Sequence, residues 1–160
     1  SPLNNEIPDK DADLIWLPGG YPELYAKELS EANSTRNALH KLSKDVKIHG
    51  ECGGYMSLGE ALVDKNGNIF KMFGLLGLVS SYEKRKLHLG YRIAKIKNNS
   101  HNYNKFKVIR GHEFHYSSII SQPDQELYEV FDANNKIVSE TGSLRENVSG
   151  TFFHAISEVS

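Results

Sequence analysis

The stretch VKIHGECGGYM, residues 46–56, has the form of a strand that ends in a tight turn and continues into a helix. The same arrangement with serine is a nucleophile elbow, a strained turn that presents its side chain at the carboxyl end of a strand. Gly50, Gly53 and Gly54 suit such a turn, because its backbone angles are ones that residues with a Cβ resist. A thiol here also lies near the positive end of a helix dipole, which favours the thiolate. The stretch therefore predicts that Cys52 is a nucleophile, although a single cysteine is most often a small buried side chain without chemistry.

Strand and helix patterns alternate on both sides of this turn. Apolar runs bounded by turn residues are typical of buried strands, and Pro22 suits the first position of a helix. Strands are expected at 14–17, 46–50, 89–96 and 147–156, and helices at 23–43 in two pieces, the second capped by Asn33 or Ser34, and from the turn to residue 62. Because strands and helices in this order form parallel sheets with right-handed crossovers, residues 1–160 are predicted to be a single α/β domain.

The composition argues against several classes of function. A net charge of −1 and a pI near 6.6 give no reason to expect nucleic acid or an anionic membrane as partner. No apolar run has the length of a membrane span, and the start of the chain lacks the pattern of a signal peptide. A single cysteine cannot form an internal disulfide, which suits the reducing cytoplasm. The chain also contains no P-loop motif for ATP.

A thiol nucleophile needs a base, and the chain has seven histidines. His154 lies near the end of the last predicted strand and can fold back beside Cys52, because active sites of open α/β sheets gather at the carboxyl ends of the strands. His115 is the main alternative. Four others lie along a strand or on segments without a motif: His40, His49, His88 and His101.

Backbone N–H groups are the usual donors to a developing oxyanion. The N–H of Gly53 follows the nucleophile directly, and the Gly19–Gly20 turn ends the neighbouring strand, so these glycines are the expected donors. The alternative for Gly19–Gly20 is an ordinary tight turn.

A cluster of polar side chains could also suggest a metal ion. His112, Glu113 and His115 lie close together in the sequence. Zinc takes three or four convergent ligands, and no further ligand is evident. No metal site is therefore expected.

Four motifs occur in an order that resembles a known family. They are PGGYPEL at 18–24, GECGGYM at 50–56, LGYR at 89–92 and GHEFHYS at 111–117. Over nearly its whole length the chain resembles the C-terminal class I glutamine amidotransferase domain of cobyrinic acid a,c-diamide synthases. The resemblance implies a flavodoxin-like fold, with a mostly parallel sheet and helices on both faces, that hydrolyses glutamine to glutamate and ammonia.

The resemblance also implies roles for individual residues. Cys52 matches the nucleophile, His154 the histidine that activates it, and Gly19 or Gly20 with Gly53 the oxyanion hole. Five further residues match positions expected to shape the glutamine pocket or to contact a second domain: Tyr21, His112, Glu113, His115 and Tyr116.

In the family, an N-terminal synthetase domain is the partner of the glutaminase domain. It uses ATP and Mg²⁺ to activate the a and c carboxylates of cobyrinic acid, which ammonia then amidates in cobalamin biosynthesis. The chain here begins after the family's first strand and helix, so it is expected to be a fragment of a longer chain. The sheet edge left open by that strand could pair with a second copy as a homodimer.

One departure from the family pattern concerns the group that orients the histidine. Many class I amidotransferases place a glutamate two residues after it, where this chain has Ile156. Glu158 is the expected substitute, and a Cys-His pair can also work without a third group. The alternatives to a glutaminase are a non-catalytic binding module with the same fold and a thiol hydrolase of other specificity. A nickel-sirohydrochlorin a,c-diamide synthase would share the same motifs.

Overall fold

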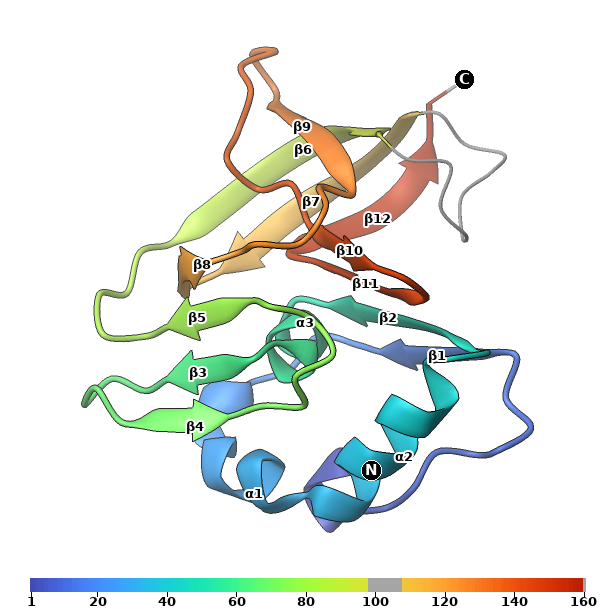
Figure 1. Cartoon of the computed structure of the whole chain (residues 1–160). Coiled ribbons are helices and arrows are strands. Elements are labelled where there is room, and N and C mark those ends of the chain that lie inside the picture. The colour runs from blue at the N-terminus through green and yellow to red at the C-terminus, as the bar shows by residue number, and fades with distance from the viewer. Residues whose placement is uncertain (98–107, 160) are drawn as a thin grey trace.

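The structure is a computed structural model, and it describes residues 1–97 and 108–159, so the segment that contains His101 lies outside the described residues. Its strands form three four-stranded sheets (Figure 1). The central sheet has the order β1 (Leu14–Leu17), β2 (Lys47–Glu51), β11 (Val148–Thr151) and β10 (Ser143–Arg145). The second has the order β12 (Phe153–Glu158), β7 (Val108–His115), β6 (His88–Ile96) and β9 (Tyr128–Asp132). The third has the order β4 (Ile69–Lys71), β3 (Ala61–Val63), β5 (Val79–Ser81) and β8 (Ser118–Ser121).

The α/β class is as predicted, but parallel pairing is limited. β1 and β11 both pair in parallel with β2, and β3 pairs in parallel with β5. Every other pairing between these strands is antiparallel. The predicted mostly parallel sheet therefore corresponds to the central sheet, in which β1 forms one edge.

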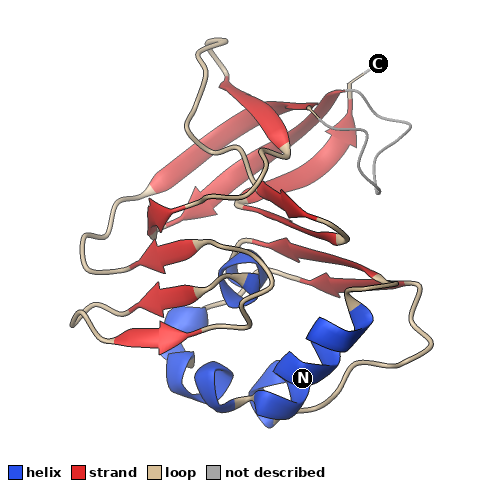
Figure 2. Cartoon of the chain, in the orientation of Figure 1, coloured by secondary structure: helices blue, strands red, loops and turns tan. Residues whose placement is uncertain are grey.

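The helices pack against one face of the central sheet. They are the 3₁₀ helices η1 (Pro2–Asn4) and η2 (Pro22–Leu24) and the α-helices α1 (Ala26–Glu31), α2 (Asn33–Leu42) and α3 (Gly53–Leu58). Figure 2 shows the helices in blue, gathered at the end of the molecule away from the second sheet. All three α-helices contribute buried residues to one core, together with Leu17 and Ile48 from the central sheet. The sequence predicted helices on both faces of the sheet, whereas the described helices lie on one face.

The start of α2 differs from the sequence prediction. Asn33 is the first helical residue, and the preceding residue, Ala32, has no side chain that could cap the helix. The cap comes instead from the N-terminal segment, because Asn5 Oδ1 accepts hydrogen bonds from the backbone N–H groups of Ser34 at 2.7 Å and Thr35 at 3.2 Å. A side chain 29 residues away in sequence thus satisfies the N–H groups that a helix start leaves without partners.

The last predicted strand, 147–156, is wrong as a single element. β11 ends at Thr151, and β12 begins at Phe153 in a different sheet. The residue between them, Phe152, is fully buried, with its ring 5.2 Å from that of Tyr55 and 3.9 Å from that of His115. Burial of this ring between the two sheets redirects the chain, and His154 is thereby carried on the second sheet.

The predicted extension of the elbow helix to residue 62 is also wrong. Helix α3 ends at Leu58, Gly59 is extended, and Leu62 lies in β3. A Cβ on Gly59 would lie 2.5 Å from the carbonyl oxygen of Leu78, so close packing occupies the path that a longer helix would take.

Replacing Gly54 with alanine is expected to destabilise the fold. The added Cβ would lie 2.0 Å from the carbonyl oxygen of Leu17, and both atoms belong to packed elements, β1 and α3. We expect the free energy of unfolding to fall by about 3 kcal/mol or more, measured by chemical denaturation. Gly20→Ala is the control, because no atom lies within 4 Å of its added Cβ. Equal stability of the two variants would contradict this packing.

Candidate active site

The turn at Cys52 is strained at the cysteine itself. Cys52 has φ 48° and ψ −105°, in a region that residues with a side chain rarely occupy. The sequence prediction assigned the unusual angles to the flanking glycines, but none of Gly50, Gly53 and Gly54 has a positive φ. These glycines are required by close approach instead, since a Cβ on Gly50 would lie 2.7 Å from the backbone of α3. The strain at Cys52 matches that of a nucleophile elbow.

His154 lies beside Cys52, and its interaction with the thiol raises the pKa of the imidazole. The other contact of its ring is from Nδ1 to Glu51 Oε2 at 3.1 Å, which leaves Nε2 for the sulfur. The pKa of His154 is raised from 6.5 to about 9. The interaction with Cys52 is the largest cause of this rise, and the hydrogen bond with Glu51 is the second. The imidazole is therefore positively charged at neutral pH, and a cation next to sulfur favours a reactive thiolate.

The carboxylate that orients the histidine is Glu51. Sequence analysis pointed to Glu158, which is exposed and lies four residues beyond His154 on β12. Glu51 went unrecognised because neighbouring residues of a regular strand point to opposite faces, so the residue before the nucleophile is not expected beside it. The positive φ of Cys52 breaks that alternation at the end of β2, and both side chains reach His154.

Glu51→Gln is expected to lower the pKa of His154 from about 9 towards 6.5. The amide keeps the shape of the carboxylate but removes the negative charge that favours the imidazolium. Because folding raises this pKa, protonation of His154 stabilises the fold fully below pH 6.5, and that contribution is lost as the pH rises to about 9. NMR titration of the ring measures the shift, with Glu31→Gln at an exposed position of α1 as control. A pKa unchanged in Glu51→Gln would exclude the ion pair.

The expected oxyanion glycines lie next to this pair. A Cβ on Gly19 would lie 3.4 Å from His154 Cε1 and 3.8 Å from Cys52 Cβ. A Cβ on Gly53 would lie 2.6 Å from the backbone nitrogen of Gly20. The Gly19–Gly20 turn therefore packs against the start of α3 at the nucleophile, which is where oxyanion donors are needed.

The GHEFHYS block is divided between the two faces of β7. His112 is in register with His154 on β12, and their rings stack at 4.9 Å. The carbonyl oxygen of Phe114 lies 3.6 Å from Cys52 Sγ. Tyr116 is exposed and packs edge-on against Phe114, and Tyr21 is also exposed. His112 thus contacts His154 through its side chain.

Glu113 and His115 face the interior. Glu113 accepts hydrogen bonds from Arg92 Nε and His115 Nε2, both at 2.8 Å. Burial acts to raise the pKa of Glu113, but these two hydrogen bonds outweigh it and the pKa is lowered. His115 Nδ1 is engaged by Ser117 at 3.0 Å, so both of its ring nitrogens already have partners. His115, the alternative base, is therefore committed to this internal network.

A metal ion would fit this internal cluster poorly. His88, Glu113 and His115 offer ligand atoms within 4.8 Å of one another. The two imidazole rings are stacked 4.6 Å apart at an angle of 2°, so their in-plane lone pairs run parallel and cannot converge on one ion. Arg92 also occupies the second oxygen of Glu113. His112, the third residue of the sequence-derived set, points to the other face of β7.

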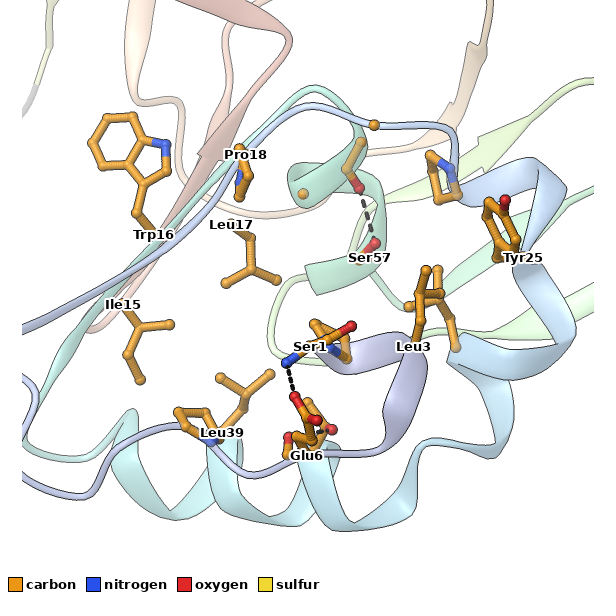
Figure 3. Close-up of a pocket in the computed structure, with 18 of the residues that line it drawn as sticks. Ser1, Leu3, Glu6, Ile15, Trp16, Leu17, Pro18, Tyr25, Leu39 and Ser57 are labelled. Carbon is orange, nitrogen blue, oxygen red and sulfur yellow. Dashed lines mark hydrogen bonds and ion pairs between the residues drawn. The ribbon is translucent and has the colours of Figure 1, made fainter.

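A cavity of about 470 Å³ is lined in part by the Gly19–Gly20 turn. Its walls are largely apolar and include Ile15, Leu17 and Leu39 (Figure 3). Neither Cys52 nor His154 lines it. Three glycines expected at the oxyanion hole, Gly19, Gly20 and Gly53, line this cavity as well.

Comparisons with known proteins agree with this geometry. The family model of the CobB/CobQ-like glutamine amidotransferase domain matches residues 1–159. A hydrogenobyrinate a,c-diamide synthase from Rhodobacter capsulatus is 52% identical over 98% of this chain and 36% of its own length. One from Mesorhizobium japonicum is 44% identical over 100% of this chain and 37% of its own length. The chain thus spans little more than a third of these relatives.

Solved structures support the fold independently. A crystal structure of a glutamine amidotransferase has a TM-score of 0.58 at 12% identity and covers 91% of this chain and 71% of its own. A glutamine amidotransferase from Thermotoga maritima has a TM-score of 0.58 at 17% identity and covers 93% of this chain and 58% of its own. In addition, the described helices include none with the length and apolar character needed to cross a membrane.

Proposed function

Because the chain belongs to the CobB/CobQ-like glutamine amidotransferase domain family, we propose that Cys52 and His154 are the catalytic pair of a glutaminase. The observation that carries this proposal is the strained Cys52 next to a His154 held by Glu51. Such a pair activates a thiol and supplies a proton, which are the two requirements of amide hydrolysis through a thioester. A catalytic thiol must also stay reduced, which favours the cytoplasm as its location.

In the proposed mechanism, the thiolate of Cys52 attacks the side-chain amide carbon of glutamine. The N–H groups of Gly53 and of Gly19 or Gly20 hold the negative oxygen of the tetrahedral intermediate. The protonated His154 then donates its proton to the nitrogen, the C–N bond breaks, and ammonia leaves a thioester on Cys52. Neutral His154 next takes a proton from water, which attacks the thioester, and glutamate is released with the thiol restored.

The ammonia would serve a synthesis carried out by the rest of the parent chain. The relatives are named hydrogenobyrinate a,c-diamide synthases and are far longer than this chain. We propose that a synthetase domain of the same parent chain uses ATP and Mg²⁺ to activate the a and c carboxylates of a corrin such as cobyrinic acid. Ammonia from the glutaminase then amidates them. A nickel-sirohydrochlorin substrate is less favoured, since neither relative bears that name.

An exposed apolar face next to His154 suits this partner domain. Leu89 and Phe114 are paired in register on β6 and β7, and they are 59% and 43% exposed. Tyr91 on β6 is 75% exposed and Ile156 on β12 is 63% exposed, and both line a second cavity of about 320 Å³. Contiguous exposed apolar side chains of this kind mark interaction sites. Their place beside His154 would let ammonia pass directly between domains.

Replacing Tyr91 with glutamate tests this surface in the parent protein. A buried, unpaired carboxylate would weaken docking, so we expect glutamine-dependent amidation to fall about tenfold or more. Amidation supplied with ammonium salt should be unchanged, because it does not need the glutaminase domain. Glu31→Gln, at an exposed position on α1, is the control. Equal loss with both nitrogen sources would place the defect in the synthetase instead.

The glutaminase activity itself is tested by assay of the chain with glutamine. We expect release of glutamate and ammonia in equal amounts, with no turnover of asparagine, whose side chain is shorter by one methylene. A folded chain that binds glutamine without hydrolysing it would favour the binding-module alternative. Turnover of unrelated amides or esters would favour a thiol hydrolase of other specificity.

A further inference from the structure

A buried glutamate outside the catalytic pair is tied to the junction between β11 and β12. Glu140 lies in the segment between β9 and β10 and is only 3% exposed. Its Oε1 accepts three hydrogen bonds, from Thr151 Oγ1 at 2.8 Å and from the backbone N–H groups of Gly142 and Phe152, both at 3.0 Å. Its Oε2 is buried and has no hydrogen-bond partner among the described residues. Glu140 therefore contacts the junction through Oε1, whereas Oε2 has no partner there.

Thr151 connects this glutamate to the reacting groups. Its carbonyl oxygen accepts the N–H of Cys52 at 2.8 Å, and it is in register with Glu51 across the sheet. Its hydroxyl also accepts the N–H of Phe153 at 3.0 Å, the residue before His154. Thr151 therefore contacts the backbone N–H groups of Cys52 and of Phe153, and Glu140 accepts a hydrogen bond from its hydroxyl group.

Glu140 also holds the backbone of the junction at Phe152. The chain leaves one sheet at Thr151 and enters another at Phe153. Between them, the backbone N–H of Phe152 donates to Glu140 Oε1 at 3.0 Å, and the ring of Phe152 packs between Tyr55 and His115. Without the Glu140 side chain, the N–H of Phe152 would lose this hydrogen bond, and the position of His154 relative to Cys52 would be less well fixed.

We propose that Glu140 is a positioning residue, which holds the Thr151–Phe152 junction so that His154 stays within hydrogen-bond reach of Cys52. This inference rests on the proposed glutaminase function. The burial that removes Glu140 from water also raises its pKa, so the group is suited to a neutral hydrogen-bonding role in the interior. Glutamine at this position would keep the accepting oxygen and place its NH₂ where Oε2 now has no partner.

The test compares Glu140→Ala and Glu140→Gln in the full chain, with folding checked by thermal unfolding. For Glu140→Ala we expect kcat for glutamine to fall by about 10- to 100-fold, as for a small misplacement of a catalytic group, while KM changes by less than about threefold. Glu140→Gln should restore kcat to within about threefold of the original chain. A merely structural role would lower stability in both variants without this rescue of kcat.

A second readout does not depend on glutamine. The rate of Cys52 alkylation by iodoacetamide is measured at neutral pH, and in Glu140→Ala it should fall about tenfold or more, because the imidazolium is no longer held beside the sulfur. Glu31→Ala, at an exposed position on α1, should leave the rate unchanged. If Cys52 of the original chain is alkylated but the chain fails to hydrolyse glutamine, the proposed function fails and the positioning inference is still tested.

Thr151→Val covers the case in which Glu140→Ala does not fold. Valine keeps the volume of threonine but removes the hydroxyl that bonds Glu140 and Phe153. We expect the same fall in the rate of Cys52 alkylation and the same fall in kcat. A folded Glu140→Ala or Thr151→Val variant with unchanged kcat and an unchanged alkylation rate would overturn the proposal.

Discussion

Cys52→Ala is expected to abolish glutamine hydrolysis, with kcat reduced by about 10⁴-fold or more. Alanine removes the only thiol in the chain and leaves no group at the elbow that could form a covalent intermediate. The variant should still fold, because alanine is smaller than cysteine and introduces no clash at the buried elbow. Release of glutamate, measured with a coupled assay, gives kcat.

Cys52→Ser separates the chemistry from the fold at this position. The hydroxyl has nearly the size of the thiol but ionises far less readily, so the histidine would have to remove its proton during attack. We expect kcat at least about 10³-fold below that of the original chain. Full activity in either variant would show that the hydrolysis takes place elsewhere.

His154→Asn is expected to lower kcat by about 10²- to 10⁴-fold, the range for loss of a general acid and base. The imidazolium both stabilises the thiolate and protonates departing ammonia, and asparagine can do neither. The pH dependence of Cys52 alkylation should change as well, because a cation that persists to about pH 9 is lost. Measurement of both quantities distinguishes loss of catalysis from a binding defect.

His40→Asn is the matched control for this variant. His40 is exposed on α2, where its Nε2 contacts the carbonyl oxygen of Phe73 at 2.7 Å, away from the elbow. Its replacement should leave kcat within about twofold of the original value. An equal loss in His40→Asn and His154→Asn would contradict the assignment of His154 as the base.

The elbow could be predicted from the local sequence. The geometry of residues 46–56 depends on contacts within a few residues of Cys52 and on glycines whose need can be read from their spacing. His154 could be placed from topology alone, because the carboxyl ends of neighbouring parallel strands meet at one edge of a sheet. These two residues were predicted, and the structure brings their side chains together.

The features that could not be predicted from the sequence depend on long-range packing. The run 147–156 alternates like one strand, and only the burial of Phe152 between Tyr55 and His115 divides it between two sheets. The contact of Glu51 with His154 depends on the backbone angles of Cys52, which the residue pattern does not state. Glu140 lies in a polar segment where nothing local indicates burial.

We propose that Cys52 and His154 form an assembled nucleophile and base in this chain. Mass spectrometry of the chain after incubation with the glutamine analogue diazo-oxo-norleucine tests this, with Cys52→Ala as control. We expect one adduct for each chain, located on Cys52, with protection by excess glutamine. A folded chain that takes no adduct, or takes it at another residue, would contradict it.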